Sequence, residues 1–449
     1  MAEKFYHDLM EEVRNQFTAE EQAGLIIDLQ TVQKQNHQEL VGLTVRQTDS
    51  NVAPCIYMNE AKIRYEHGES MQVLAAEIKR AYLESLSLIP PAKMMEMDLR
   101  NYDKIKDQIT MRLLDIRRNE AFLQDKPYQD AGNGLALTFD IRLKQQTGDF
   151  YSVTINNRML EDLGCSKEDL MQQANENAWK INTPVFCSMQ SKLTGGLFGD
   201  TSGNYLEDPH VISPQEKEAM YILSNEDMTM GAASLFVEPV QKQIAWLLNE
   251  GYYVLPSSIH EVLIVPESSD MDVQDICSMV REANRSVVNE PDVLSDFVYH
   301  YDPERDVLQT ILSTREPYLL SLQDLKDPAF AVENRTDYEK ALKTSVLGSM
   351  ENAMESMYRE GKSQVPFGRI VSDALRRTAE DPKLKESLDY CMQSAPSMKA
   401  KIEAGQLVTV DPEGIRKLQK TFRAELGLSG EREGSKHIHA VRDRGEEIA

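Results

Sequence analysis

The most constraining feature of this sequence is a strict two-residue alternation from Leu135 to Leu143. Every odd position in the stretch is a large apolar residue, and the even positions between them hold Ala, Thr, Asp and Arg. A period of two is that of a β-strand, because successive side chains point to opposite faces of a sheet. Turn residues at 146–149 lead into a second apolar run at 150–155. We therefore expect an antiparallel pair with one face covered by helices and the other partly wet.

Shorter segments with strand or helix periods surround this pair. Strands are expected at 41–45, 52–58, 109–113, 220–223, 252–255, 262–265 and 297–301, the last being the final strand of the body. Helices are expected at 3–17, at 69–87, at 167–180 after a Ser166 cap, at 240–250 before a Gly251 stop, and from Asp270 onward. Together these segments predict an α+β fold with mixed, largely antiparallel sheets covered by helices.

The pattern changes after about residue 325, where helical spacing replaces alternation. Thr336 followed by Glu339 has the form of a capping box, and we expect the helix it opens to reach Gly361. Residues 326–428 are predicted to form an all-helical C-terminal extension, and 429–449 a disordered tail. The body is expected to divide into an N-terminal subdomain at 1–125 and a central subdomain at 126–325, which includes a glycine-rich loop at 190–217.

Charge and cysteine content limit the classes of function. The 449 residues carry a formal charge of −24, while residues 361–449 alone are close to neutral at +2. A strongly negative body disfavours direct nucleic-acid binding and an anionic membrane surface. The N-terminus lacks the features of a secretory signal, and apolar stretches such as 23–29 are too short to span a membrane. Five dispersed cysteines without a CxxC pair argue against disulfides and zinc, so we expect a cytoplasmic protein without a cofactor.

Four separated motifs carry a family resemblance. They read NHQELVGLTVRQTDSNVAPCIYMNEAKIRYEHGE at 36–69, MYILSNEDMTMGAASLFVEPV at 220–240, GYYVLPSSIHEVLIVPE at 251–267 and LSDFVYHYD at 294–302. In this order they resemble an uncharacterised bacterial family, a domain of unknown function common in anaerobic gut Firmicutes. The resemblance covers about residues 1–310 and implies a compact α+β body. It assigns no activity, and it leaves the C-terminal extension and the glycine-rich insert at 190–204 outside.

One group of residues has the composition of a hydrolytic site. Ser258, His260 and Glu261 fall in a short turn between two expected strands, and they supply a nucleophile, a base and an orienting carboxylate. No G-x-S-x-G sequence surrounds the serine. The alternative is a hairpin turn in which the serine hydroxyls cap backbone groups and the histidine is satisfied locally.

A metal site is a further hypothesis. His300 and Asp302 point to the same side of an expected strand, and His260 and Asp296 could join them if that strand lies beside 252–265. Imidazole and carboxylate groups suit a divalent metal. Solvated strand edges are the alternative, because nothing in the sequence determines the pairing and no HExxH sequence is present.

The C-terminal extension carries the candidates for binding a partner. Met350, Met354 and Met357 share one helix face, which is ordinary core spacing but also suits adaptable binding of a partner helix. The basic side chains of the next helix, Arg369, Arg376 and Arg377, are either solvated or used to dock an acidic partner. Because no complete catalytic signature occurs, we interpret the chain as a non-enzymatic accessory or protein-interaction protein. The alternative is a hydrolase or metal-dependent enzyme at Ser258, His260 and Glu261.

Overall fold

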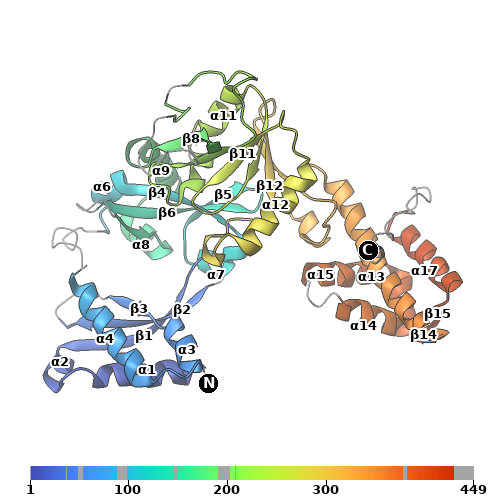
Figure 1. Cartoon of the computed structure of the whole chain (residues 1–449), viewed down its shortest axis with the longest axis horizontal. Helices are drawn as coiled ribbons and strands as arrows, with labels where there is room; N and C mark the ends of the chain where they lie inside the picture. The colour runs from blue at the N-terminus through green and yellow to red at the C-terminus, as the bar shows by residue number, and fades with distance from the viewer. Residues whose placement is uncertain are drawn as a thin grey trace, which may run out of the picture. The chain divides into compact units, whose positions relative to one another are not determined.

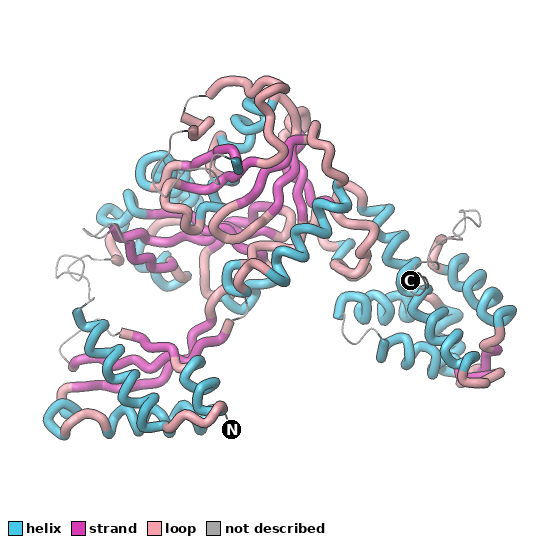
Figure 2. The backbone as a smooth tube through the Cα atoms, viewed as in Figure 1, coloured by secondary structure: helices cyan, strands magenta, loops and turns pink. Residues whose placement is uncertain are grey.

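The structure is a computed structural model that describes residues 2–36, 38–48, 54–87, 99–144, 150–190, 203–207, 209–377 and 382–428. Its contacts divide the chain into two compact units, Met1–Gln309 and Thr310–Ala449. The fold is α+β, as predicted, with antiparallel sheets in the first unit and helices predominating in the second (Figures 1 and 2). The subdomain boundaries predicted at 125 and 325 remain predictions.

The first unit begins with a three-stranded antiparallel sheet, in the order β1-β2-β3, and four helices. The elements are α1 (Ala2–Asn15), α2 (Ala19–Ala23), β1 (Leu25–Gln33), β2 (Glu39–Gln47), β3 (Cys55–Tyr57), α3 (Asn59–Glu66) and α4 (Met71–Ser87). Helices α1 and α4 bury their apolar stripes against one face of this sheet (Figure 1). The sequence predicted the β2–β3 pair but missed β1, because Ile26 and Val32 add apolar residues to its second face and blur the alternation.

The second sheet is built on the alternating segment. Strand β6 (Leu135–Lys144) pairs with β4 (Ile109–Asp115) on one side and with β5 (Tyr128–Gly132) and β7 (Phe150–Thr154) on the other. The expectation that one face would be partly wet is wrong, because Ala136, Thr138 and Asp140 are as buried as the apolar face. Burial of the charged position is tolerated because Asp140 pairs with Arg112, at 2.7 Å between Oδ2 and Nη2.

A third, six-stranded sheet has the order β13-β12-β10-β11-β9-β8. Its strands are β8 (Pro184–Ser188), β9 (Tyr221–Asn225), β10 (Tyr252–Leu255), β11 (Val262–Pro266), β12 (Val298–Asp302) and β13 (Val307–Ile311). The sequence predicted neither β8 nor β13. Part of the glycine-rich loop lies along β8, where Asn204 accepts the Phe186 N–H at 3.0 Å and donates to the Pro184 carbonyl at 3.0 Å. Those bonds occupy the outer side of β8.

Helices and short turns complete the first unit. They are α6 (Tyr102–Ile105), η1 (Lys106–Gln108), η2 (Arg117–Asn119), α7 (Glu120–Leu123), α8 (Asn157–Leu163), α9 (Lys167–Ile181), η3 (Gly231–Phe236), α11 (Val240–Leu248), α12 (Val273–Ser286) and η4 (Glu290–Asp292). The predicted Ser166 cap is present, because its hydroxyl accepts the Asp169 N–H at 3.0 Å. Gly251 does not end α11: Asn249 adopts the left-handed conformation there, and Gly251 instead allows two strands to approach closely.

The second unit is helical, with one short antiparallel ribbon that the sequence did not predict (Figure 2). Its elements are η5 (Asp324–Lys326), α13 (Arg335–Arg359), β14 (Gln364–Pro366), α14 (Phe367–Arg377), α15 (Pro382–Ser394), α16 (Pro396–Glu403), β15 (Leu407–Thr409) and α17 (Pro412–Glu425). Helix α13 packs against α14, α15 and α17. The expected capping box at Thr336 is absent, because the helix begins at Arg335 and its N-cap Asn334 bonds instead to the backbone of Leu312. The predicted tail at 429–449 lies outside the described residues.

Two glycines provide a matched test of this packing. A Cβ atom at Gly251 would lie 2.8 Å from the Tyr301 carbonyl oxygen, whereas at Gly348, within α13, it would meet open space. We expect Gly251→Ala to destabilise the first unit by about 1–3 kcal/mol, because the backbone must shift. Gly348→Ala should stabilise the second unit by about 0.5–1 kcal/mol through helix propensity. Urea unfolding followed by circular dichroism measures both; a neutral Gly251→Ala would contradict the strand packing.

Candidate functional site

The turn between β10 and β11 holds the predicted hydrolytic residues, but they bond to the turn itself. Ser258 Oγ accepts the His260 N–H at 3.0 Å, and the Ser258 N–H donates to the Glu261 carbonyl at 3.1 Å. The Glu261 carboxylate accepts from the Ser257 hydroxyl at 3.5 Å. These are the local contacts of a structured turn.

The His260 ring points to other parts of the unit. Its Nδ1 accepts the Met230 N–H at 3.2 Å, so the ring proton resides on Nε2, which lies 3.4 Å from Asp292 Oδ1. Both ring nitrogens are thus engaged with groups other than Ser258 and Glu261. A serine nucleophile requires a base within hydrogen-bond reach of its hydroxyl, and the structure provides no such contact in this turn.

The predicted metal residues are separated in the same way. His300 lies on β12, where its Nε2 contacts the Glu267 carboxylate and its ring packs on Tyr253 at 5.1 Å between centroids. Asp302 accepts the backbone N–H groups of Glu304 and Arg305 in the following turn. Across the described residues, no group of three or more His, Cys, Asp or Glu side chains could hold a metal ion.

Strand pairing explains why His260 and His300 do not converge. His300 is paired with Tyr253, near the open end of the β10–β11 hairpin, whereas His260 lies in the closed turn beyond Leu255. Asp296, the fourth residue of the predicted metal group, accepts from Asn284 Nδ2 at 2.8 Å. The sequence could not show this, because it did not determine which end of β12 faces the turn.

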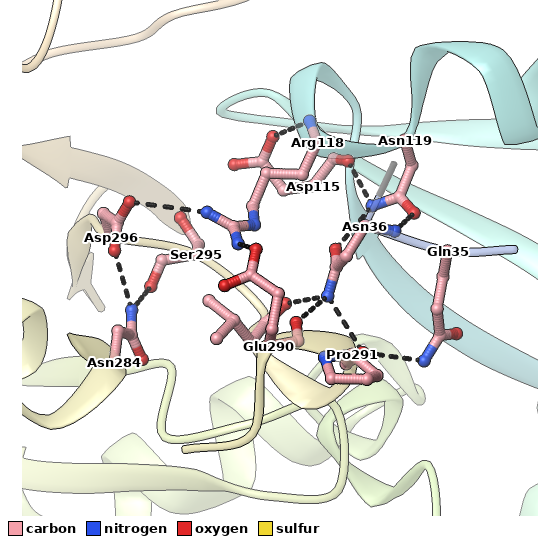
Figure 3. Close-up of polar contacts among 11 residues, drawn as sticks. Gln35, Asn36, Asp115, Arg118, Asn119, Asn284, Glu290, Pro291, Ser295 and Asp296 are labelled. Carbon is pink, nitrogen blue, oxygen red and sulfur yellow. Dashed lines mark hydrogen bonds and ion pairs between the residues drawn. The ribbon is translucent and has the colours of Figure 1, made fainter. Parts of the chain in front are cut away.

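The tip of the β1–β2 hairpin makes a buried polar contact that sequence reasoning missed (Figure 3). Asn36 is in the left-handed conformation, with φ 56°, and its side chain is buried. Its Nδ2 lies 3.0, 2.9 and 2.8 Å from the backbone carbonyl oxygens of three residues, which are Glu290, Pro291 and Val293. A carboxamide has only two N–H bonds, so at least one of them is shared between two carbonyls.

A second asparagine completes this contact. The Asn36 N–H donates to Asn119 Oδ1 at 2.7 Å, and Asn119 Nδ2 donates back to Asn36 Oδ1 at 3.3 Å. Asn119 also donates to the Asp115 carbonyl at 2.9 Å, and Gln35 donates to the Pro291 carbonyl at 2.9 Å (Figure 3). The side chains of Gln35 and Asn36 are therefore bonded to residues far away in the sequence.

Charged groups extend the network along residues 289–296. Arg118 Nη2 donates to Glu290 at 2.9 Å, and its Nη1 lies 3.7 Å from Asp296 (Figure 3). The same segment accepts the Ile259 N–H on the Asp292 carbonyl at 2.9 Å and presents the Asp292 carboxylate to His260. The segment 289–296 therefore connects the hairpin tip, the turn at 115–119 and the predicted hydrolytic turn.

Asp115 is the buried acid of this region. It is 5% exposed, and its Oδ1 accepts the N–H groups of Arg117 and Arg118 at 2.9 and 3.1 Å. Burial raises the pKa of the Asp115 carboxyl, and the nearby Arg117 charge and the two N–H bonds partly offset that effect.

The second unit has a shallow groove of about 270 Å³ lined by Met357, Glu360, Lys362, Arg369, Ser372, Asp373 and Arg376. Two of the predicted partner-binding arginines and one predicted methionine thus lie around one depression. The side chains of Met350, Met354 and Met357 are all buried, which places them in the helical core, with Met357 reaching the groove. Arg377 lies beside the groove and pairs with Asp373 at 3.0 Å.

The chain is an α+β protein. In its first unit, the polar contacts of residues 289–296 join the β1–β2 hairpin to the turn at 115–119 and to the β10–β11 turn. Residues 2–303 match the family model DUF5688, a family of unknown function, and the chain belongs to this family. The match ends near Gln309, the last residue of the first unit, so the second unit lies outside it. A comparison with curated proteins finds no match, and neither does one with solved structures. Within the described ranges, no helix is both long and apolar enough to cross a membrane.

The Asn36 contact can be tested by substitution. Asn36→Gly keeps the left-handed backbone accessible but removes the carboxamide. The carbonyls of Glu290, Pro291 and Val293 then lose a shared donor, and the bond to Val293 is buried. We expect the first unit to lose about 2–4 kcal/mol of unfolding free energy. Gln33→Ala, which removes an exposed bond on the same hairpin, should cost less than about 0.5 kcal/mol. Equal effects of the two changes in urea unfolding would refute the role of Asn36.

The Asp115 carboxyl predicts a pH dependence with a definite sign. Because its pKa is raised by folding, the folded state binds more protons than the unfolded state above the ordinary value of 3.8. The contribution of Asp115 to stability therefore falls as the pH rises. Asp115→Asn keeps an acceptor for both N–H bonds and cannot ionise. As the pH rises from 4 to 7, the unfolding free energy of Asp115→Asn should therefore increase relative to that of the wild type. A difference that does not vary with pH would contradict the raised pKa.

Proposed function

We propose that this chain is a non-enzymatic protein-interaction protein, and that its second unit binds an acidic segment of a partner protein in the groove bounded by Lys362, Arg369 and Arg376. The observation that carries the proposal is the arrangement of three cations around a depression that Met357 also lines. Such a surface suits a segment that combines carboxylates with an aliphatic side chain.

The internal ion pairs of the groove leave one cation available. Lys362 contacts the Glu360 carboxylate and lowers its pKa, while Arg369 contributes only a weaker, longer-range effect. Although burial opposes the change, Arg377 and Arg376 lower the pKa of Asp373. Arg369 is exposed, and within the described part of the chain it makes no ion pair. An ion pair with a partner's carboxylate should therefore contribute more binding free energy at Arg369 than at Lys362 or Arg376.

The groove lies against buried side chains of α13 and α14. Met357 is 3% exposed and belongs to the same buried stripe of α13 as Met350 and Met354. On α14, Phe367 and Ile370 are fully buried, so the helix that carries the arginines is held by its apolar side. Because this packing holds the backbone that carries the arginines in place, little conformational entropy is lost when a partner binds. A smaller entropy loss allows useful affinity at a site that has no deep cavity.

The distribution of charge supports a protein partner rather than a polyanion. Residues 1–360 carry a balance of −26, which repels nucleic acid and anionic lipid, whereas residues 361–449 carry +2. We propose a cytoplasmic location as well, which the five free cysteines support. The contacts of Ser258, His260 and Glu261 favour no hydrolase or metal-dependent reaction, so we propose none.

A charge reversal in the groove tests the proposal. A fluorescein-labelled peptide of repeated Glu-Glu-Leu-Glu serves as the probe for the full chain, and fluorescence anisotropy measures its Kd. We expect Arg369→Glu to weaken binding about tenfold, because it replaces an attraction by a repulsion.

Lys385→Glu is the matched control, since it changes the charge equally on the exposed side of α15, away from the groove lining. It should leave the Kd within about twofold. If the two variants lost affinity equally, the peptide would be responding to the net charge of the chain and not to the groove, which would count against the proposal. Absence of binding to the acidic peptide would refute the groove as the site.

A further inference from the structure

Strand β1 is the edge of the first sheet, and its outer side pairs with nothing in the described chain. The sheet order is β1-β2-β3, and β1 has nine residues, Leu25–Gln33. An edge of this length exposes a row of backbone donors and acceptors that another strand can pair with. Proteins commonly protect such an edge with lysine, proline or a bulge. The sequence LIIDLQTVQ contains neither lysine nor proline, and its pairing with β2 is continuous over all nine positions.

The register determines which backbone groups point outward. Partners in β1 and β2 have numbers that add to 72, and the flanking bonds from Thr48 N–H to Gly24 carbonyl and from Lys34 N–H to Gln38 carbonyl continue this register. Even-numbered residues therefore bond to β2. The N–H and carbonyl groups of the odd residues, namely Leu25, Ile27, Leu29, Thr31 and Gln33, point away from the sheet.

One side chain reaches this edge. Arg14, on α1, donates to the Ile27 carbonyl at 3.2 Å. A carbonyl oxygen has two lone pairs, so it can accept a second hydrogen bond from a neighbouring strand. No other group among the described residues bonds to this edge. Its odd side chains belong to the core face of the sheet, where Ile27 is buried and Leu25 and Leu29 are partly buried.

The sequence of β1 is complementary to itself in one register. An antiparallel copy centred on Leu29 overlaps all nine residues and pairs odd with odd positions, as the outward groups require. It sets Asp28 opposite Gln30 of the copy, where an amide can donate to a carboxylate, and Ile26 opposite Val32. A register shifted by one residue along each strand sets the two Asp28 carboxylates against each other, which is unfavourable.

We propose that two copies of this chain associate through β1, antiparallel and with the two-fold axis at Leu29, so that the two three-stranded sheets form one sheet of six strands. The register centred on Leu29 gives the longest overlap and also avoids placing the two Asp28 carboxylates opposite each other. Because β1 fits a second β1 in this way, we take a second copy of the chain as the partner of the edge. Such an interface is isologous, since each copy supplies the same strand.

Removal of one outward donor tests the association. Thr31→Pro deletes an N–H that points away from β2, so the internal sheet keeps its bonds. Sedimentation velocity on the full chain should show a dimer for the wild type and for the control Thr31→Val, which retains the N–H. Thr31→Pro should shift the chain to a monomer with an unchanged circular dichroism spectrum. A wild type that stays monomeric, or a dimer that survives Thr31→Pro, would overturn the proposal.

Charge at the neighbouring position tests the register independently of folding. Gln30 is exposed on the open face of the sheet. In Gln30→Lys, each of the two lysines lies opposite Asp28 of the other copy, so the dimer Kd should fall about three- to tenfold. Gln30→Glu places like charges there and should raise the Kd by a similar factor. Equal effects of the two variants on the dimer Kd would exclude the register centred on Leu29.

Discussion

The first unit depends on the carboxamide of Asn36, which enters a turn where three backbone carbonyls converge. Those carbonyls belong to η4 and its flank and lie outside any sheet, and burial of the Val293 carbonyl without a donor would be costly. Asn36 satisfies them from the tip of a hairpin that begins and ends elsewhere. The hairpin of the N-terminal sheet is thus joined to η2 and η4 by hydrogen bonds, whose directions make the contact more specific than apolar packing alone.

This constraint also explains why the turn that resembles a hydrolytic site bonds as it does. Asp292 lies in the segment that receives Asn36, and the same residue orients His260 and accepts the Ile259 N–H. The histidine therefore connects a hairpin turn to residues 289–296. The turn contains the three residue types of a catalytic triad: a serine, a histidine and a glutamate. A triad also requires the histidine to hydrogen-bond to both the serine hydroxyl and the carboxylate.

Sequence patterns predicted helices and strands well where a regular spacing of apolar residues marked one buried face. The alternation at 135–143 and the helical stripes of α9 and α12 depend on local periodicity, and they lie where expected. Capping signals were less reliable. Thr336 lost its role because Asn334 bonds to Leu312, and Gly251 lost its role because Asn249 took the left-handed position. At Asn334 a longer-range contact outweighed a capping preference worth about 1 kcal/mol, whereas α11 ends at a competing local cap on Asn249.

The sequence by itself determined the α+β class, the acidic composition of residues 1–360 and the helical character of the C-terminal region, because periodicity and net charge need no partner in space. Only the tertiary structure decided that Met350 and Met354 are core and that Asn36 joins the β1–β2 hairpin to η4. It also decided that His300 pairs with Tyr253, away from the turn that holds His260. Such facts depend on strand order and register. These arise from the packing of distant segments, on which no single stretch of sequence carries information.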